Sequence, residues 1–197
     1  MRPAESPFTK EADLKELPHT LDRAFTWLVQ TPTHSEWAIG DERAEQLPLQ
    51  LESVIASAKE HGIALPTEFV TFIGTPALHK HLRSVTACYL DVAESVLPFA
   101  NGYLVRFLSD QQGCAFWYIY TNADASDHCV VSSCEYFDAN EMNHEIEDLK
   151  EEDFCIWAVS LEAFLSRFWL ENEILFARYD STPPPDVDPR FLELYAQ

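Results

Sequence analysis

Apolar positions in the first part of the chain repeat at the spacing of helices. An apolar pattern over residues 21–28 falls on one helical face, and the same period returns over residues 51–58. A further helix is expected to start at Pro66, because proline suits the first helical position. The pattern predicts that helices come before the sheet, with residues 1–47 as an N-terminal helical extension.

From residue 85 onward the apolar period changes to two, which is typical of β-strands. The connections between the middle segments are short, so these strands are expected to pair antiparallel. Asn101 and Gly102 supply a turn before one of them. The pattern predicts strands over Val85–Leu90, Tyr103–Leu108, Ala115–Tyr120, His128–Ser133 and Phe154–Ala158.

The clearest helical pattern follows the last of these strands. Ser160 is a suitable N-cap, and a wide apolar stripe runs from Leu161 to Phe176. Asn172 lies within the stripe, and because a buried amide must be hydrogen-bonded, we expect it to hold the backbone of a loop. Three prolines at 183–185 then separate a short amphipathic tail.

Together these elements predict an α+β fold. We expect an antiparallel sheet of about five strands, with helices before it and a long amphipathic helix after it. The main α+β domain is expected over residues 48–180, and residues 181–197 are expected to form a proline-linked C-terminal tail.

The composition excludes several classes of partner. Acidic residues outnumber basic ones 33 to 13, which gives a net charge of −20 at pH 7. Such a surface repels phosphate groups, so nucleic acid and membranes are not expected as partners, whereas a basic protein would be attracted. The five glycines are too dispersed for a phosphate-binding loop, and we expect no cofactor. Five cysteines in apolar segments and a start without an apolar run predict buried, reduced thiols in a cytoplasmic protein.

The densest charged feature is the acidic run from Glu135 to Asp153. It holds nine acids against the single base Lys150. Such a run can raise the association rate with a basic protein, or it can be a solvated surface that maintains solubility. We predict that it contacts a partner through Glu135, Asp138, Glu145, Glu147, Asp148, Glu151, Glu152 and Asp153.

Aromatic residues on one predicted strand offer a second surface. Tyr118 and Tyr120 share a strand face with Phe116, and that face is either core or an open aromatic surface for protein binding. We include both tyrosines among the predicted partner-binding residues. Arg106 is expected on the same strand face as Leu104 and Leu108, where it either clamps a carboxylate of a partner or pairs with an acid of this chain.

Metal-site and catalytic patterns are weak in this sequence. His128 and the neighbouring Cys129 point to opposite faces of a strand. Cys129 and Cys134 enclose four residues, which is wider than the usual spacing of a zinc-binding cysteine pair, so no metal is expected. No nucleophile motif is found, and we expect no enzymatic activity. The alternative is an enzyme of hydrolytic type, in which Cys114 meets a distant histidine on the sheet.

The segment from Glu60 to Ile73 resembles the entry motif of the SUKH superfamily, which includes the Smi/Knr cell-wall-regulator-like proteins. The motif has Leu-Pro, an aromatic three residues later and an apolar pair beyond. The Asn101-Gly102-Tyr103 turn, the aromatic strand around Trp117 and the helix from Ser160 to Tyr179 are similar to later parts of that family.

This resemblance implies a protein-binding role. Bacterial members are commonly immunity proteins that neutralise a toxin, and no catalytic residues belong to the family as a whole. We therefore expect a bacterial immunity protein that binds a basic toxin domain. A scaffold whose tail from Pro183 to Gln197 docks on a neighbouring subunit is a further alternative.

Overall fold

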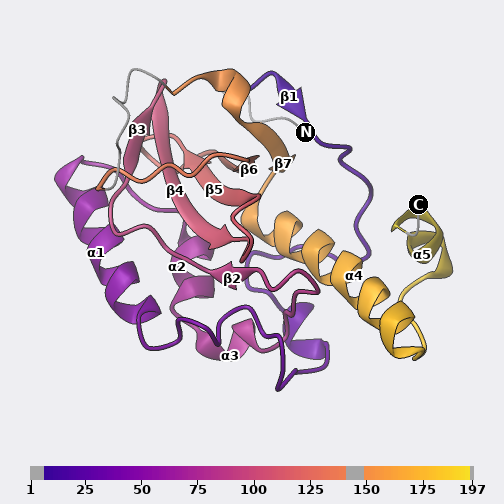
Figure 1. Ribbon diagram of the computed structural model, residues 1–197. Coiled ribbons are helices and arrows are strands. Elements are labelled where there is room, and N and C mark those ends of the chain that lie inside the picture. Colours follow the sequence, from indigo (N-terminus) through magenta and orange to yellow (C-terminus); the bar gives the residue numbers. More distant parts are fainter. Residues whose placement is uncertain (1–6, 141–148, 196–197) are drawn as a thin grey trace.

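A sheet lies between a layer of helices and a connecting segment, of which residues 134–140 and 149–154 are described (Figure 1). The computed structural model describes residues 7–140 and 149–195. Its α-helices are α1 (Leu47–Glu60), α2 (Thr67–Ile73), α3 (Pro76–His79), α4 (Leu161–Asp180) and α5 (Pro189–Tyr195). The mixed helices and mostly antiparallel sheet confirm the predicted α+β class.

Within the described residues the sheet has seven strands rather than about five. Its order is β1-β7-β6-β5-β4-β2, and β3 also pairs with β4. Only the β1–β7 pair is parallel among the pairs described. The strands are β1 (Lys10–Glu11), β2 (Tyr89–Leu90), β3 (Leu97–Phe99), β4 (Gly102–Ser109), β5 (Phe116–Thr121), β6 (His128–Ser133) and β7 (Cys155–Ala158).

Each face of the sheet contributes to a separate apolar core. On the helical side, Val105, Ile119 and Val130 belong to the larger core, which also contains Phe164 of α4. On the other side, the sheet's apolar side chains join a smaller core with Phe8, Phe137 and Phe154. Both faces are therefore covered, one by helices and the other by segments without long helices (Figure 1).

An irregularity in β4 divides its side chains between these cores. The register with β5 shifts between Arg106 and Leu108. Leu104 belongs to the smaller core, whereas Leu108 belongs to the larger one. Because a bulge changes the alternation of side chains, the expectation that Leu104 and Leu108 share a face is wrong.

The helix α4 forms as its sequence predicts. The Ser160 side chain accepts a hydrogen bond from Ala163 N at 3.1 Å, which confirms the N-cap. Asn172 is buried, accepts from Val85 N at 2.9 Å and donates to Phe168 O at 2.9 Å. The predicted loop contact of Asn172 is therefore confirmed.

The N-terminal residues are not a helical extension. Between Pro7 and Gln46 the described helical structure is one 3-10 turn, Leu28–Gln30. Phe25, Trp27 and Leu28 are buried in the larger core, so this segment is an integral part of the fold. The prediction of a helix over residues 21–28 is wrong.

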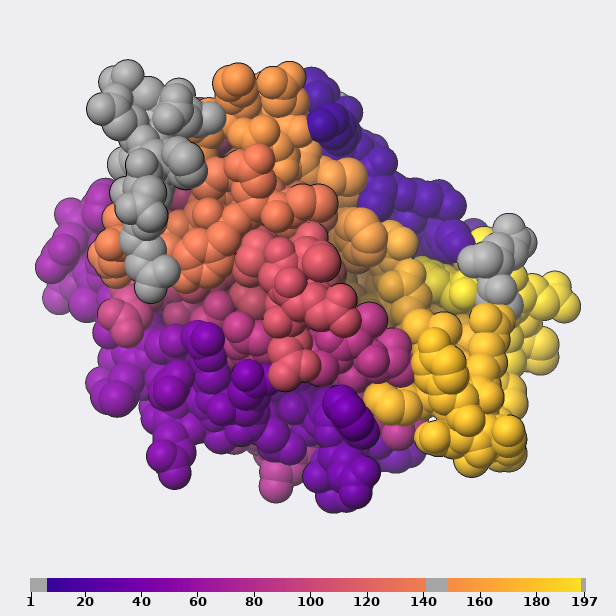
Figure 2. Space-filling model, in the orientation of Figure 1, coloured from indigo at the N-terminus to yellow at the C-terminus, as the bar shows by residue number. Residues whose placement is uncertain are grey.

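The C-terminal tail docks on its own chain. Tyr195 donates a hydrogen bond to Glu16 O at 3.0 Å, and Lys15 donates to Leu194 O at 2.8 Å. Phe191 and Tyr195 are buried by this packing. Figure 2 shows the yellow tail next to the indigo N-terminal segment. The scaffold alternative expected this tail to dock on a neighbouring subunit. In this structure the tail packs on its own chain instead.

Candidate functional site

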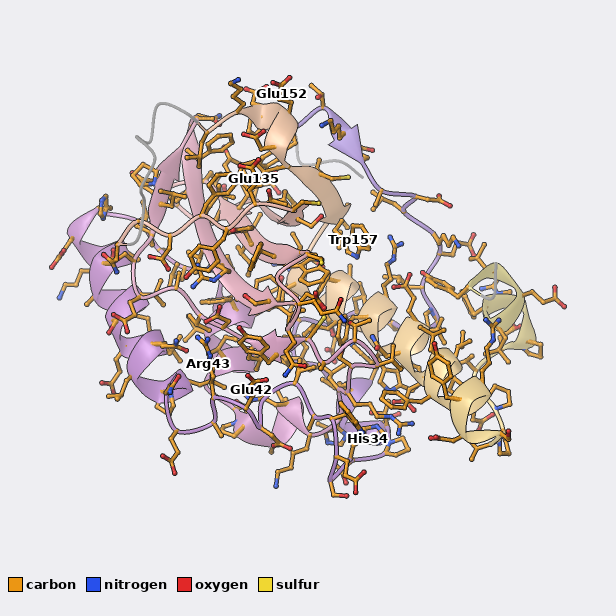
Figure 3. All side chains as sticks on the ribbon, viewed as in Figure 1. His34, Glu42, Arg43, Glu135, Glu152 and Trp157 are labelled. Atoms are coloured by element: carbon orange, nitrogen blue, oxygen red, sulfur yellow. The ribbon has the colours of Figure 1, made fainter. Side chains whose placement is uncertain are left out.

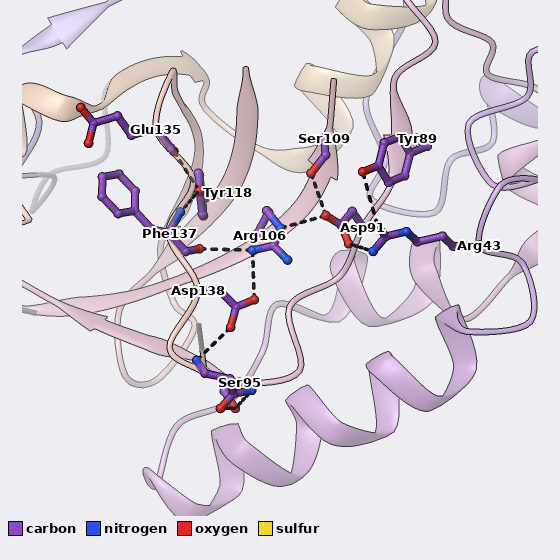
Figure 4. Close-up of polar contacts among 11 residues, drawn as sticks. Arg43, Tyr89, Asp91, Ser95, Arg106, Ser109, Tyr118, Glu135, Phe137 and Asp138 are labelled. Atoms are coloured by element: carbon purple, nitrogen blue, oxygen red, sulfur yellow. Dashed lines mark hydrogen bonds and ion pairs between the residues drawn. The ribbon is translucent and has the colours of Figure 1, made fainter. Parts of the chain in front are cut away.

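The described parts of the acidic run, residues 135–140 and 149–153, belong to two stretches that cross the smaller core. We call Cys134–Asn140 and Leu149–Phe154 the cover segment. Phe137 and Phe154 bury their rings against the sheet. Tyr118 of β5 donates a hydrogen bond to Glu135 O at 3.3 Å and accepts one from Phe137 N at 2.9 Å (Figure 4). The sheet thus fixes the backbone of the cover segment.

This arrangement makes the prediction of an open aromatic surface wrong. Tyr118 is 1% exposed and Tyr120 is 5% exposed, because the cover segment and Phe8 lie over them. Tyr120 donates a hydrogen bond to Asn101 Oδ1 at 2.6 Å, and its ring packs edge-on against Phe8. Burial raises the pKa of Tyr118 above its ordinary value, so its hydroxyl stays protonated and can still donate its hydrogen bond in alkaline solution. Neither tyrosine is accessible to a partner.

Arg106 is the centre of a buried polar network (Figure 4). Its Nε donates to Asp91 Oδ2 at 3.1 Å, and its Nη1 donates to Asp138 Oδ2 at 3.0 Å. The same Nη1 donates to Phe137 O at 3.2 Å. Of the two alternatives for Arg106, the pairing with acids of its own chain is confirmed. The network joins β4 to the cover segment.

Asp91 extends this network toward the surface. It accepts a hydrogen bond from Ser109 Oγ at 2.8 Å and pairs with Arg43. Arg43 also lies over the ring of Tyr89, with 4.9 Å between the guanidinium carbon and the ring centre. Sequence reasoning missed Arg43 and Asp91, since neither residue belongs to a motif. A polar hollow of about 300 Å³ opens here, lined also by Gln50 and Tyr136.

The network gives Asp138 a structural role. Its side chain is buried, accepts from Arg106 and also accepts from Asn140 N at 2.9 Å. A carboxylate paired in this way anchors the cover segment. The prediction that Asp138 contacts a partner is wrong, because its oxygens are engaged inside the molecule.

Other acids of the run face solvent. Glu135, Glu151 and Glu152 are exposed, and Figure 3 shows Glu135 and Glu152 in the same upper part of the molecule. Asp153 is half-buried and accepts from Lys150 N at 2.9 Å, which caps a 3-10 turn. The predicted contact residues Glu145, Glu147 and Asp148 lie outside the described residues.

A second buried carboxylate, Glu68 of α2, holds the helical layer to the sheet. One of its oxygens, Oε1, pairs with His128 of β6 and accepts from Leu161 N at 2.9 Å. The carboxylate therefore connects α2, β6 and the first turn of α4. Its other oxygen, Oε2, is buried without a hydrogen-bond partner among the described atoms.

The five cysteines lie in different environments. Cys88 and Cys129 are buried, and burial raises the pKa of the Cys88 thiol. Cys114 and Cys134 are exposed, so the expectation of buried thiols is wrong for these two. Within residues 7–140 and 149–195, no group of three or more metal-ligating side chains is placed to hold an ion.

Comparison with known proteins adds no relative. No family model, no curated protein and no solved structure matches this chain. Within the same described residues, no helix has both the length and the apolar character needed to cross a membrane.

Proposed function

We propose that this protein is a non-enzymatic protein-binding module of the SUKH type, and that its partner is a basic protein. In the bacterial form of this proposal, it is a cytoplasmic immunity protein that neutralises a toxin domain. The support is the resemblance of the segment from Glu60 to Ile73, together with the charge and geometry of the cover segment.

One observation carries the proposal: exposed acids stand on a backbone that the core holds in place. Glu135 and Glu151 are exposed, while Phe137 and Phe154 of the same cover segment are buried against the sheet. A preorganised charged surface loses little conformational entropy when a partner binds. Charges of this kind mainly raise the rate of association with a surface of opposite sign.

The sign of the charge favours one class of partner. A toxin that acts on nucleic acid needs a basic surface, because phosphate groups bind lysine and arginine. A protein with a net charge of −20 is attracted to the same surface and can cover it. The acidic cover segment then contacts the surface that the nucleic acid would use.

The test reverses two exposed charges after a partner has been purified by affinity capture from the organism that encodes this chain. The variant carries Glu151→Lys and Glu152→Lys, which leave the buried anchors unchanged. A matched control carries Glu52→Lys and Glu60→Lys on exposed positions of α1. Both variants change the net charge equally, so a difference between them reports the position of the charges.

Stopped-flow association at low ionic strength is the measurement. We expect the cover-segment variant to associate about tenfold more slowly than wild type, with a smaller change in the control. The difference should shrink at high ionic strength, because salt screens exposed charges. Equal rates for the two variants would contradict the role of the cover segment, and capture of no basic protein would contradict the proposed partner class.

A further inference from the structure

Trp37 is a large aromatic side chain on the surface. It is 58% exposed, whereas Trp27 is 7% and Trp169 is 4% exposed. Its backbone has a φ of 64°, in the left-handed region that is unfavourable for a bulky residue. An exposed tryptophan in such a conformation persists only where its surroundings impose the conformation.

Hydrogen bonds on both sides hold this backbone. Ser84 N donates to Trp37 O at 3.1 Å, and Ile39 N donates to Leu82 O at 3.0 Å. Ala38 and Arg83 form an isolated antiparallel bridge between them. The indole is therefore presented by a fixed backbone, as expected of an aromatic anchor in a binding surface.

A polar hollow of about 320 Å³ opens beside Trp37, and Phe176 of α4 also lines it. Arg83 lines it too, with Nε and Nη2 donating to the two oxygens of Glu173 at 2.8 and 2.9 Å. The guanidinium carbon of Arg83 lies 3.9 Å from the ring centre of Phe176. Since Glu173 compensates Arg83, this arginine leaves little net positive charge in the hollow.

Negative charge remains at the rim of the hollow. Glu36 and Asp180 both line it and both are exposed. Asp180 is also the last residue of the 20-residue helix α4, and the carbonyl end of a helix carries a partial negative charge. The open face of a tryptophan attracts cations as well. All three features favour a positively charged ligand group.

We propose that this hollow binds an arginine or lysine side chain of a partner protein. The charged head lies over the Trp37 indole and pairs with Glu36 and Asp180. The volume is at the lower end for small-ligand sites, which suits one side chain. His34, which lines the hollow, lies at the end of the molecule opposite Glu152 in Figure 3, so this contact is separate from the cover segment.

The test is an NMR titration of the full chain with Nα-acetyl-arginine amide. Its matched ligand is Nα-acetyl-citrulline amide, which has nearly the same shape without the charge. The Trp37→Leu variant identifies the indole N–H signal of Trp37 by its loss. We expect a saturable shift of that signal with the arginine compound and no saturable shift with the citrulline compound.

Two variants then locate the binding site. Glu36→Gln with Asp180→Asn is expected to weaken binding of the arginine compound about tenfold, because both rim charges are lost. The control, Glu52→Gln with Glu60→Gln on α1, is expected to bind as wild type. Backbone spectra that match wild type show that each variant is folded.

Three results would overturn the inference: an unsaturable Trp37 shift, an equal response to citrulline, or unchanged binding after the rim charges are removed. None of them depends on the purified partner or on the cover segment. The titration can therefore fail while the proposed function stands, and the reverse also holds.

Discussion

At the scale of single residues, Arg106 connects the two structural parts that position the acidic surface. Its side chain is 4% exposed and pairs with Asp91 and Asp138, which are buried to a similar extent. A buried charge that loses its partner is left in a medium of low polarity. Removing Arg106 would leave Asp138 without its ion-pair partner and would leave Asp91 paired with Arg43 alone.

We predict that Arg106→Met lowers the free energy of unfolding by about 3–5 kcal/mol. Methionine retains apolar volume, so the loss reports the missing guanidinium beside Asp138 and Asp91. The control is Arg190→Met, because Arg190 is 65% exposed and its ion pair with Glu16 spans 3.7 Å. That variant should lose less than about 1 kcal/mol. Urea unfolding measures both, and similar losses would contradict the importance of the buried network.

The sequence predicted an ion pair for Arg106 without identifying its partners. Asp91 and Asp138 are 15 and 32 residues away along the chain, and many other acids were equally eligible. The bulge in β4, the cover segment and the hydrogen bond from Asp91 N to Phe107 O bring these three side chains together (Figure 4). Similarly, the period of β5 placed Tyr118 on one face but could not show what covers that face.

At the scale of elements, α5 closes the fold by packing against the N-terminal segment. We predict that truncation after Asp180 lowers the free energy of unfolding by about 2–4 kcal/mol, since it removes the buried rings of Phe191 and Tyr195. The molecular mass of the particle should fall only by that of the missing residues. Size-exclusion chromatography with light scattering measures this mass. A molecular mass that falls to half would show that the tail joins two subunits.

A second prediction concerns the junction of the N-terminal segment with α4. His19 lies 2.9 Å from Ser166 Oγ and stacks on Trp27. Burial lowers the pKa of His19 from 6.5 to about 4. The unfolded chain therefore takes up a proton near pH 6.5, whereas the folded chain does so only near pH 4.

The stabilising effect of neutral His19 is complete above pH 6.5 and decreases as the pH falls from 6.5 toward 4. We predict that His19→Phe reduces the loss of stability across this interval. Urea unfolding at several pH values measures the slope, and His61→Gln, at an exposed position, serves as the control. An unchanged slope in His19→Phe would show that folding does not lower the pKa of His19.

Helix prediction succeeded at α4 and failed near residue 25 for a local reason. The Ser160 cap and the apolar stripe of α4 are both readable in sequence. Near residue 25, Asp22 Oδ1 accepts from Ala24 N at 2.9 Å, and Arg23 and Phe25 adopt left-handed backbone. An aspartate that captures a nearby backbone N–H competes with the helix. Apolar spacing alone does not reveal this competition.

At the scale of the whole molecule, the acidic surface has opposite effects on folding and on binding. A net charge of −20 makes the folded state repel itself, which lowers stability. The same charge accelerates encounter with a basic partner. We therefore expect that an acid whose role is in binding lowers the stability of the folded state. An acid whose role is in local structure should not lower it.

Neutralising Glu151 and Glu152 separates these two roles. We predict that Glu151→Gln with Glu152→Gln raises the thermal midpoint at low ionic strength, and that added salt removes the difference, because exposed charges are screened. The same variant should associate more slowly with the purified basic partner. Thermal unfolding and stopped-flow binding measure the two effects. A lower midpoint would instead assign these acids to the first turn of the 3-10 helix in which they lie, where a negative charge is favourable.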